Sequence, residues 1–224
     1  QLDLANSNIS WEETTTSNIG IDFGLLEGRL NFTADYFTRT TDEILLQLPI
    51  PLIIGLNAPF QNAGSVKNTG WEFTAGYKQN IGEDFDFKIN FNISDVNNEV
   101  TDLKGAGPFI TGSSIIQEGD PINAIFGFES EGLFDSQDEI DDHAAQPGQI
   151  APGDIKYKDQ NDDGLINFDD RVVIGDPFPN FNYGLNLGAN YKNFDVSVFF
   201  QAIGSRDVRL QGDAVYALWN AGKV

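Results

Sequence analysis

The sequence predicts an all-β fold in which antiparallel, up-and-down strands form part of a transmembrane β-barrel, with long loops at one end. Three observations lead to this prediction. Apolar and polar residues alternate over long stretches, and the links between these stretches are short and long in turn. The 224 residues also include 23 glycines, which favour turns between strands.

The alternating stretches define the strands. The clearest runs over 85–94, where every second side chain is apolar and the side chains between them are polar. Because successive side chains of a strand point to opposite faces, this strand has one apolar and one polar face. The same pattern recurs at 19–23, 30–36, 71–77, 183–191 and 194–201. The alternation thus predicts about six strands, several of them close to the roughly ten residues that a tilted strand needs to cross a bilayer.

The links between these strands differ in length in a regular way. Residues 24–28, 80–84 and 192–193 form short links, whereas residues 41–68 and 97–180 form long ones. Successive antiparallel strands place their links alternately at the two ends of a sheet, so all the short links fall at one end. Outer-membrane barrels have this asymmetry, with tight periplasmic turns and long extracellular loops. We therefore expect 41–68 and 97–180 to be extracellular loops.

The same features place the chain in a larger barrel. Aromatic side chains flank the short links, as in the girdles of outer-membrane barrels: Tyr77, Phe85, Tyr191 and Phe194. A sheet of about six strands is too small to close, since the smallest barrels have about eight. The sequence lacks methionine and a recognisable signal peptide. We expect residues 1–224 to be an excerpt of a longer protein of the outer membrane of a Gram-negative bacterium.

Composition narrows the classes of function. The net charge of −21 would repel a phosphate backbone, so no nucleic-acid partner is expected. The absence of cysteine excludes a disulfide scaffold, a thiolate zinc site and a cysteine nucleophile. No apolar run reaches the length of about 18 residues that a transmembrane helix requires.

A soluble fold with similar strands is the alternative. In a β-sandwich the apolar faces of two sheets pack against each other. A secreted, calcium-stabilised, β-rich adhesion or carbohydrate-binding module would show the same acidity and alternation. The two readings differ in one respect, because a barrel exposes its apolar face to outer-membrane lipid and a sandwich buries it.

The sharpest chemical signal is the segment 159–170, DQNDDGLINFDD. It fits the calcium-loop pattern D-x-[DN]-x-[DN]-G, with a carboxylate six residues after the glycine. Oxygen atoms at alternate positions of a tight turn suit a hard cation such as Ca²⁺, and Gly164 permits the turn. The expected ligands are Asp159, Asn161, Asp163, the backbone carbonyl of Leu165, Asn167 and Asp170.

The context of this loop limits its role. No helical periodicity flanks it, so we expect a structural Ca²⁺ that stiffens a long extracellular loop, without the sensing role of paired helices. The competing interpretation is a solvated turn rich in Asp and Asn that binds no specific ion.

Catalysis is not expected. The single histidine, His143, adjoins the acidic stretch 135–142 and is predicted to lie in a solvated short helix, away from any metal or general-base role. No nucleophile is paired with it. Carboxylate pairs such as Asp138 and Glu139 are common in so acidic a chain and do not indicate glycoside hydrolysis.

Several segments resemble one receptor family. Residues 62–77, NAGSVKNTGWEFTAGY, resemble the segment that leads into a barrel strand in SusC/RagA-type TonB-linked receptors. Residues 152–187, PGDIKYKDQNDDGLINFDDRVVIGDPFPNFNYGLNL, resemble their loop-plus-strand segment and form the more specific match. Further similar segments are 11–25, 118–134 and 191–201. Together these segments cover most of the chain.

The resemblance implies a barrel of about 22 strands with a plugged lumen. It also implies a plug reached by TonB, in a region outside this sequence, and a SusD-like lipoprotein that closes over the outer loops. The expected function is then a component of a transporter that imports a glycan or a peptide, with no covalent chemistry. Within this chain only the 159–170 loop carries over residue by residue, as a divalent-cation site.

Overall fold

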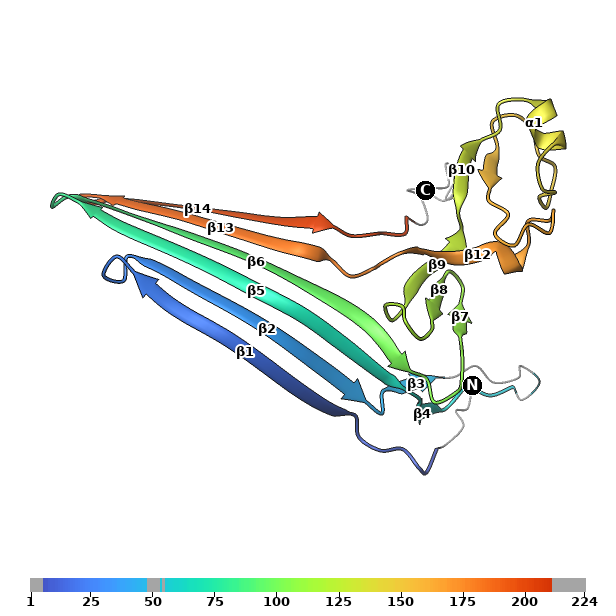
Figure 1. The fold of residues 1–224 in the computed structure, drawn as a ribbon, viewed down its shortest axis with the longest axis horizontal. Helices are drawn as coiled ribbons and strands as arrows, with labels where there is room; N and C mark the ends of the chain where they lie inside the picture. Colours follow the sequence, from blue (N-terminus) through green and yellow to red (C-terminus); the bar gives the residue numbers. More distant parts are fainter. Residues whose placement is uncertain (1–5, 48–52, 54, 211–224) are drawn as a thin grey trace, which may run out of the picture. The chain divides into compact units, whose positions relative to one another are not determined.

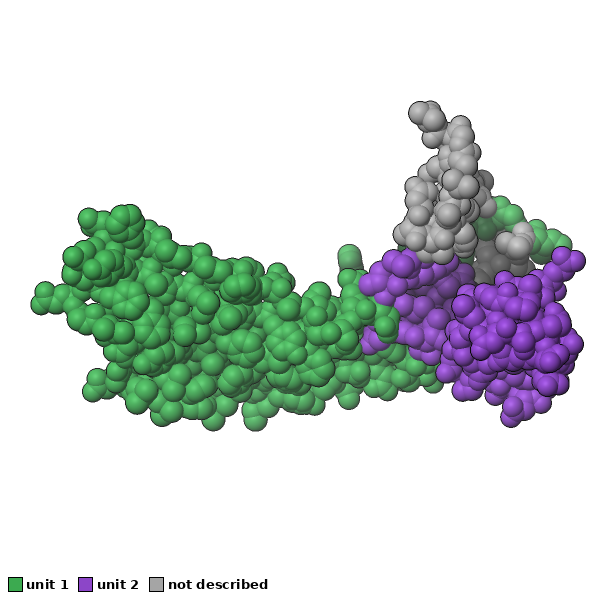
Figure 2. All heavy atoms as spheres, turned by 90° about the horizontal axis from the view of Figure 1, so that it is seen from above, with its two compact units in different colours: residues 1–109, 116–122, 177–207 green, residues 110–115, 123–176, 208–224 purple. Residues whose placement is uncertain are grey.

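The computed structural model describes residues 6–47, 53 and 55–210. The parts of the expected segments that fall on 1–5, 48–52, 54 and 211–224 lie outside the described residues. The chain divides into two compact units, shown in two colours in Figure 2. Unit 1 comprises 1–109, 116–122 and 177–207, and unit 2 comprises 110–115, 123–176 and 208–224. Each unit is described by itself.

Unit 1 is built on an antiparallel sheet of six strands in the order β1-β2-β5-β6-β13-β14 (Figure 1). The strands are β1 (Glu13–Leu25), β2 (Leu30–Asp42), β5 (Ser65–Ile81), β6 (Phe85–Asp102), β13 (Asn180–Tyr191) and β14 (Phe194–Ser205). Strands that follow one another along the chain are neighbours in the sheet, so the topology is up-and-down. This confirms the predicted fold class and the predicted number of strands in the sheet.

The strands extend further than the alternation predicted. The expected long links began at residue 41 and at residue 97, but β2 continues to Asp42 and β6 to Asp102. The expected link 41–68 also ended too late, because β5 begins at Ser65. The pattern of apolar and polar residues changes near these ends while the backbone pairing continues, which is why the sequence pattern placed the ends too early.

The hydrophobic core of unit 1 lies at the end of the sheet away from the short turns. Buried residues from β5, β6 and the adjoining links form it: Ile44, Val66, Val100 and Leu103. Phe109 and Ile122 pack against this cluster. A short pair of strands, β3 (Leu45–Gln47) and β4 (Phe60–Asn62), lies within the link between β2 and β5. This link therefore carries regular structure.

Unit 2 holds most of a second sheet, in the order β12-β9-β8-β7. Its strands are β7 (Phe109–Thr111), β8 (Ser114–Ile116), β9 (Ala124–Phe128) and β12 (Arg171–Gly175). Ile115, Ala124 and Phe126 form its core. A separate pair joins β10 (Ser130–Leu133) to β11 (Ile155–Tyr157), and the helix α1 (Gln137–Asp141) lies between them in sequence. Of the described residues, none belongs to a helix long and apolar enough to cross a membrane.

Candidate functional site

The large sheet has two faces of different chemistry. We call the face that carries Phe73 and Phe91 the outer face and the opposite face the inner face. Between the short turns and the middle of the strands, the outer face carries apolar side chains and the inner face polar ones. The outer side chains are exposed on the edge strands, as Ile21 at 60% and Val196 at 62% illustrate, and half-buried on the central strands, as at Phe73 and Phe91. A β-sandwich would bury them, so this exposure favours the barrel reading.

Aromatic rings line the outer face. Near the short turns, the ring of Phe87 lies 5.9 Å from that of Tyr77 and 6.2 Å from that of Phe85. Further along the strands, the ring of Trp71 lies 6.5 Å from that of Phe181. Aromatic side chains at two levels of an apolar band are typical of strands that cross a membrane.

The inner face is held together by polar contacts between neighbouring strands. The hydroxyl of Thr33 donates to Asp22 at 2.6 Å, and the amide of Asn190 donates to Asp86 at 2.8 Å. Glycines on the inner face leave space for larger side chains of the neighbouring strands. At Gly70, for example, an added Cβ atom would lie 2.6 Å from Cζ of Phe37. The inner face thus presents carboxylates, amides and hydroxyls to whatever lies beside it.

The predicted calcium loop folds as a series of tight turns in unit 2. Asp159 Oδ2 accepts the N–H of Gly164 at 2.8 Å, and Asn161 Oδ1 accepts the N–H of Asp163 at 3.0 Å. Asp163 Oδ1 in turn accepts the N–H of Leu165 at 2.8 Å. Gly164 has a φ of +81°, a backbone conformation that favours glycine. These contacts bring the side chains of the first three predicted ligands into one turn.

The second half of the loop is more closed than the sequence suggested. A 3-10 turn spans Phe168–Asp170, and the side chain of Asn167 accepts the N–H of Asp169 at 2.8 Å. The fully buried carboxylate of Asp170 accepts the N–H of Asn167 at 2.7 Å and that of Gln160 at 2.9 Å. Both oxygens of Asp170 therefore bind backbone groups of the loop itself.

The surroundings of Asp170 favour the ionised form of its carboxyl group. The N–H of Asn167 is the main cause that lowers the pKa of Asp170, burial opposes it, and the N–H groups of Gln160 and Asn161 add to the lowering. Because the folded-state pKa lies below the unfolded one, the ionised carboxylate stabilises the loop above the unfolded value of about 3.9. This contribution is lost as pH falls through the folded-state pKa.

We therefore predict that the loop opens in acid. In the full-length protein, the protection factors of the amides of residues 159–170, which compare exchange with that of an unfolded chain at the same pH, should fall below pH 3.9 or so, the ordinary aspartate pKa. In Asp170→Asn the exchange should be faster already at neutral pH, because an amide NH₂ cannot accept a backbone N–H. Equal protection of the two proteins at neutral pH would contradict the structural role of Asp170.

The structure does not gather all the predicted ligands into one metal shell. In the described part of the chain, no group of three or more His, Cys, Asp or Glu side chains is arranged to hold a metal ion. Asp159, Asn161 and Asp163 lie together in one turn. Asp170 adjoins them, since its carboxylate accepts the N–H of Gln160 and interacts with the side chain of Asp159, whereas Asn167 caps the 3-10 turn. The exposed residue Leu165 adjoins Ala145 through a parallel bridge. Calcium binding by this loop therefore stays a prediction.

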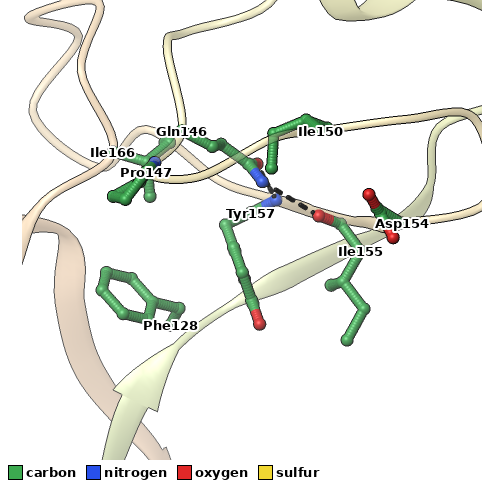
Figure 3. A pocket seen from close by; sticks show the side chains of 8 residues that line it. All are labelled: Phe128, Gln146, Pro147, Ile150, Asp154, Ile155, Tyr157 and Ile166. Atoms are coloured by element: carbon green, nitrogen blue, oxygen red, sulfur yellow. Dashed lines mark hydrogen bonds between the residues drawn. The ribbon is translucent and has the colours of Figure 1, made fainter.

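A pocket of about 450 Å³ adjoins the loop within unit 2. Figure 3 shows its lining, which consists of Phe128, Gln146, Pro147, Ile150, Asp154, Ile155, Tyr157 and Ile166. The side-chain amide of Gln146 spans the edge of β11, because it donates to the carbonyl of Ile155 at 3.0 Å and accepts the N–H of Tyr157 at 2.8 Å. Ile166, a loop residue that is 2% exposed, anchors the loop beside this pocket. Apart from Ile166, which lies in the 159–170 motif, no sequence motif marked these residues.

His143 differs from its prediction. A short helix, α1, is present in the acidic stretch as expected. However, the imidazole is not solvated, since its side chain is 14% exposed and its ring lies 5.2 Å from that of Phe134, edge to face. Nδ1 lies 3.0 Å from the carbonyl oxygen of Ala144, and Nε2 lies 3.8 Å from a carboxylate oxygen of Glu131. These contacts give His143 a packing role in unit 2.

Sequence comparison relates the chain to known proteins. The family described as "TonB dependent receptor-like, beta-barrel" matches residues 2–222. The TonB-dependent receptor P3 of Formosa agariphila is 32% identical over 210 residues, and the TonB-dependent receptor SusC of Bacteroides thetaiotaomicron is 31% identical over 204 residues. These alignments cover 89% and 88% of this chain but 21% and 20% of the relatives. The chain thus spans about a fifth of their length.

The comparison with solved structures agrees with the sequence comparison. A structure of the RagAB peptide transporter aligns with a TM-score of 0.73 at 22% identity, over 88% of this chain and 21% of that one. A structure of the RagAB peptide importer in the closed-closed state aligns with a TM-score of 0.71 at 25% identity, over 88% and 22%. The fold of this chain is therefore that of a portion of such a barrel.

Proposed function

The chain belongs to the family of TonB-dependent receptor-like β-barrels, and from this premise we propose that it forms part of the wall and the extracellular loops of a nutrient transporter in the outer membrane of a Gram-negative bacterium. One observation carries the proposal. From the short turns to the middle of the strands, the six paired strands carry an apolar face on one side, which no second sheet buries, and a polar face on the other. Such a sheet is stable where hydrocarbon covers the first face and an aqueous or plugged lumen lies beside the second.

The partners follow from the family. We propose that TonB acts through a plug outside this chain, and that a SusD-like lipoprotein covers the loops that join β2 to β5 and β6 to β13. The likeness to SusC and to the RagAB peptide transporter supports a lipoprotein partner. We propose that the cargo is an oligosaccharide or a peptide, and the likeness to the RagAB peptide importer supports the peptide. The relatives are receptors, and transport across the outer membrane requires no covalent step in this chain.

Fractionation and uptake test this proposal. The full-length protein should be recovered with the outer membrane, require detergent for extraction and copurify with a surface lipoprotein. Uptake of its nutrient should fall to the same background when either the receptor or TonB is removed. Recovery of the full-length protein from buffer as a compact monomer without detergent would overturn the proposal.

A structural Ca²⁺ in the 159–170 loop is a second proposal. Asp159, Asn161 and Asp163 present oxygen atoms from a single turn. A carboxylate oxygen has two lone-pair sites, so an oxygen that accepts a backbone N–H still has a position for a cation. The hydrogen bonds within the loop hold these oxygens in place, and a Ca²⁺ among them would reduce the repulsion between the carboxylates.

Calorimetric titration of the purified full-length receptor with Ca²⁺ tests this site. We expect binding with a Kd on the order of 10⁻⁴–10⁻³ M, as for extracellular calcium modules. The double variant Asp159→Ala, Asp163→Ala should lose this binding. The control, Asp138→Ala with Asp142→Ala, removes two exposed carboxylates from the α1 region and should retain it. Unchanged heats in the first variant would refute the assignment.

A further inference from the structure

The two faces of the large sheet exchange polarity part of the way along the strands. On the outer face of β6, the side chains from Phe85 to Ile93 are apolar, whereas those from Asp95 to the strand end are polar. The inner face changes in the opposite sense, because its polar side chains give way to Val96 and to the buried Val100, with the buried Asn98 between them. Val100 belongs to the hydrophobic core of unit 1. Beyond this level, the sheet therefore has the polarity of a soluble protein.

The strand register places the change on the outer face at one level across four strands. Four paired side chains of the outer face form what we call the boundary row: Ile19, Tyr36, Trp71 and Asp95. Two further rows, which we call the upper rows, consist of Ser17, Thr38, Thr69 and Asn97, followed by Thr15, Thr40, Lys67 and Glu99. Below the boundary row the outer side chains of these strands are apolar, apart from Gln79 near the short turn. The change of the outer face from apolar to polar is thus a property of the sheet and not of one strand.

The distance from the short turns to the boundary row fits a bilayer. Ten residues separate Phe85 from Asp95 along β6. At a rise of about 3.4 Å per residue this corresponds to about 34 Å of strand. A tilt of about 40° reduces the height to about 26 Å, against about 25 Å for the apolar band of an outer-membrane barrel. The apolar part of the sheet therefore has the height of the hydrocarbon layer.

The chemistry of the boundary row suits a membrane interface. Tyr36 and Trp71 each combine an apolar ring with a polar group, and such side chains collect where hydrocarbon meets headgroups. The carboxylate of Asp95 accepts the N–H of Phe181 at 3.2 Å. The boundary row thus lies between the aromatic surface on the side of the short turns and the polar surface on the side of the long links.

The upper rows are almost neutral in a strongly acidic chain. They hold five hydroxyl side chains, one amide and a single pair of opposite charges, Lys67 and Glu99, which face each other in the register. The whole sequence carries a net charge of −21. A strip without net charge avoids repulsion from the anionic groups of a lipid surface, and its hydroxyls donate to and accept from polar headgroups.

We propose that the boundary row marks the outer edge of the membrane hydrocarbon and that the upper rows lie against the headgroup layer of the outer leaflet. This inference rests on the proposed outer-membrane location and adds the depth at which the barrel sits. Beyond the upper rows, the ends of β2, β5 and β6 form a wall outside the membrane, with the core of unit 1 packed on its inner side.

Depth-dependent fluorescence quenching tests the inference, since the chain has no cysteine of its own. Single cysteines are introduced into the full-length receptor, with any cysteines elsewhere replaced, and labelled with bimane in lipid vesicles. One series follows β2 with Phe32→Cys, Thr38→Cys and Thr40→Cys. A second series follows β5 with Phe73→Cys and Thr69→Cys. Nitroxides attached deep in the acyl chain or at the headgroup serve as quenchers.

The ratio of deep to headgroup quenching should exceed one at positions 32 and 73 and fall below one at 38, 40 and 69. Thr33→Cys, on the inner face of β2, is the matched control and should be quenched by neither lipid probe. Stronger deep quenching at 38 and 69 would overturn the inference and leave the membrane location intact. Absence of lipid quenching at every position would instead contradict the proposed function.

Discussion

Replacing Phe134 by alanine is expected to destabilise unit 2 by about 3–5 kcal/mol, the usual cost of truncating a buried phenylalanine. Phe134 is 2% exposed, and its ring packs edge to face with that of His143. Its backbone pairs with the loop that precedes β11, through the N–H to the carbonyl of Asp154 at 2.9 Å and the carbonyl to the N–H of Gly153 at 2.7 Å. Loss of the ring leaves a cavity between these segments.

Amide hydrogen exchange of the full-length receptor measures this effect. Residues 130–157 should lose protection in Phe134→Ala, whereas β5 and β6 in unit 1 should keep theirs. The neighbouring residue Leu133 is 57% exposed, so Leu133→Ala is a matched control with an expected change of about 0.5 kcal/mol or less. Equal loss of protection in the two variants would show that Phe134 is not a core residue of unit 2.

The large sheet was predictable because one physical signal dominates it. In a strand with one polar and one apolar face, polar and apolar residues must alternate with a period of two. β6 shows this alternation over 85–94 without interruption. The short turns were predictable for a similar reason, since Lys192 and Asn193 interrupt the alternation between β13 and β14. The short links predict three of the pairs, β1 with β2, β5 with β6 and β13 with β14, and the up-and-down order predicts the other two.

The strand ends were not predictable from the same signal. Beyond Ser94, the residues that face the core of unit 1 are Asn98 and Val100, on the face that was polar before. Because the alternation of polar and apolar residues ends here, the sequence predicts a loop, although the backbone pairing continues to Asp102. The missing information is the packing of distant segments, such as Ile122, whose N–H donates to Asn98 at 2.8 Å.

Unit 2 was predicted only as a long link. Its strands are short, as in β11 (Ile155–Tyr157), and pair with segments distant in sequence, so no periodicity accumulates. The glycine turn of the 159–170 loop was visible in the sequence because the ligand spacing fixes residue types. The buried role of Asp170 was not visible, because it depends on which backbone N–H groups the fold brings to its carboxylate.

In the membrane-spanning part of the sheet, we expect Leu187→Arg to destabilise the protein. Leu187 lies on the outer face of β13, between Ile89 of β6 and Val198 of β14 in the register. Ile89 is four residues from the short-turn end of β6 and six from the boundary row, so Leu187 lies near the middle of the apolar band. An arginine there costs about 2–4 kcal/mol, because its charge has no polar partner within hydrocarbon.

Urea unfolding of the full-length receptor in lipid vesicles measures this cost. Leu187→Arg should unfold at a lower urea concentration than the parent protein. Asn186→Arg places the same charge one residue away, on the inner face, between Asn90 of β6 and Phe199 of β14. A charge on this face can be solvated in the lumen, so the variant should change the midpoint little. If the two variants were equally stable, the outer face would not contact hydrocarbon, since only a lipid-facing position distinguishes one side of the strand from the other in this way.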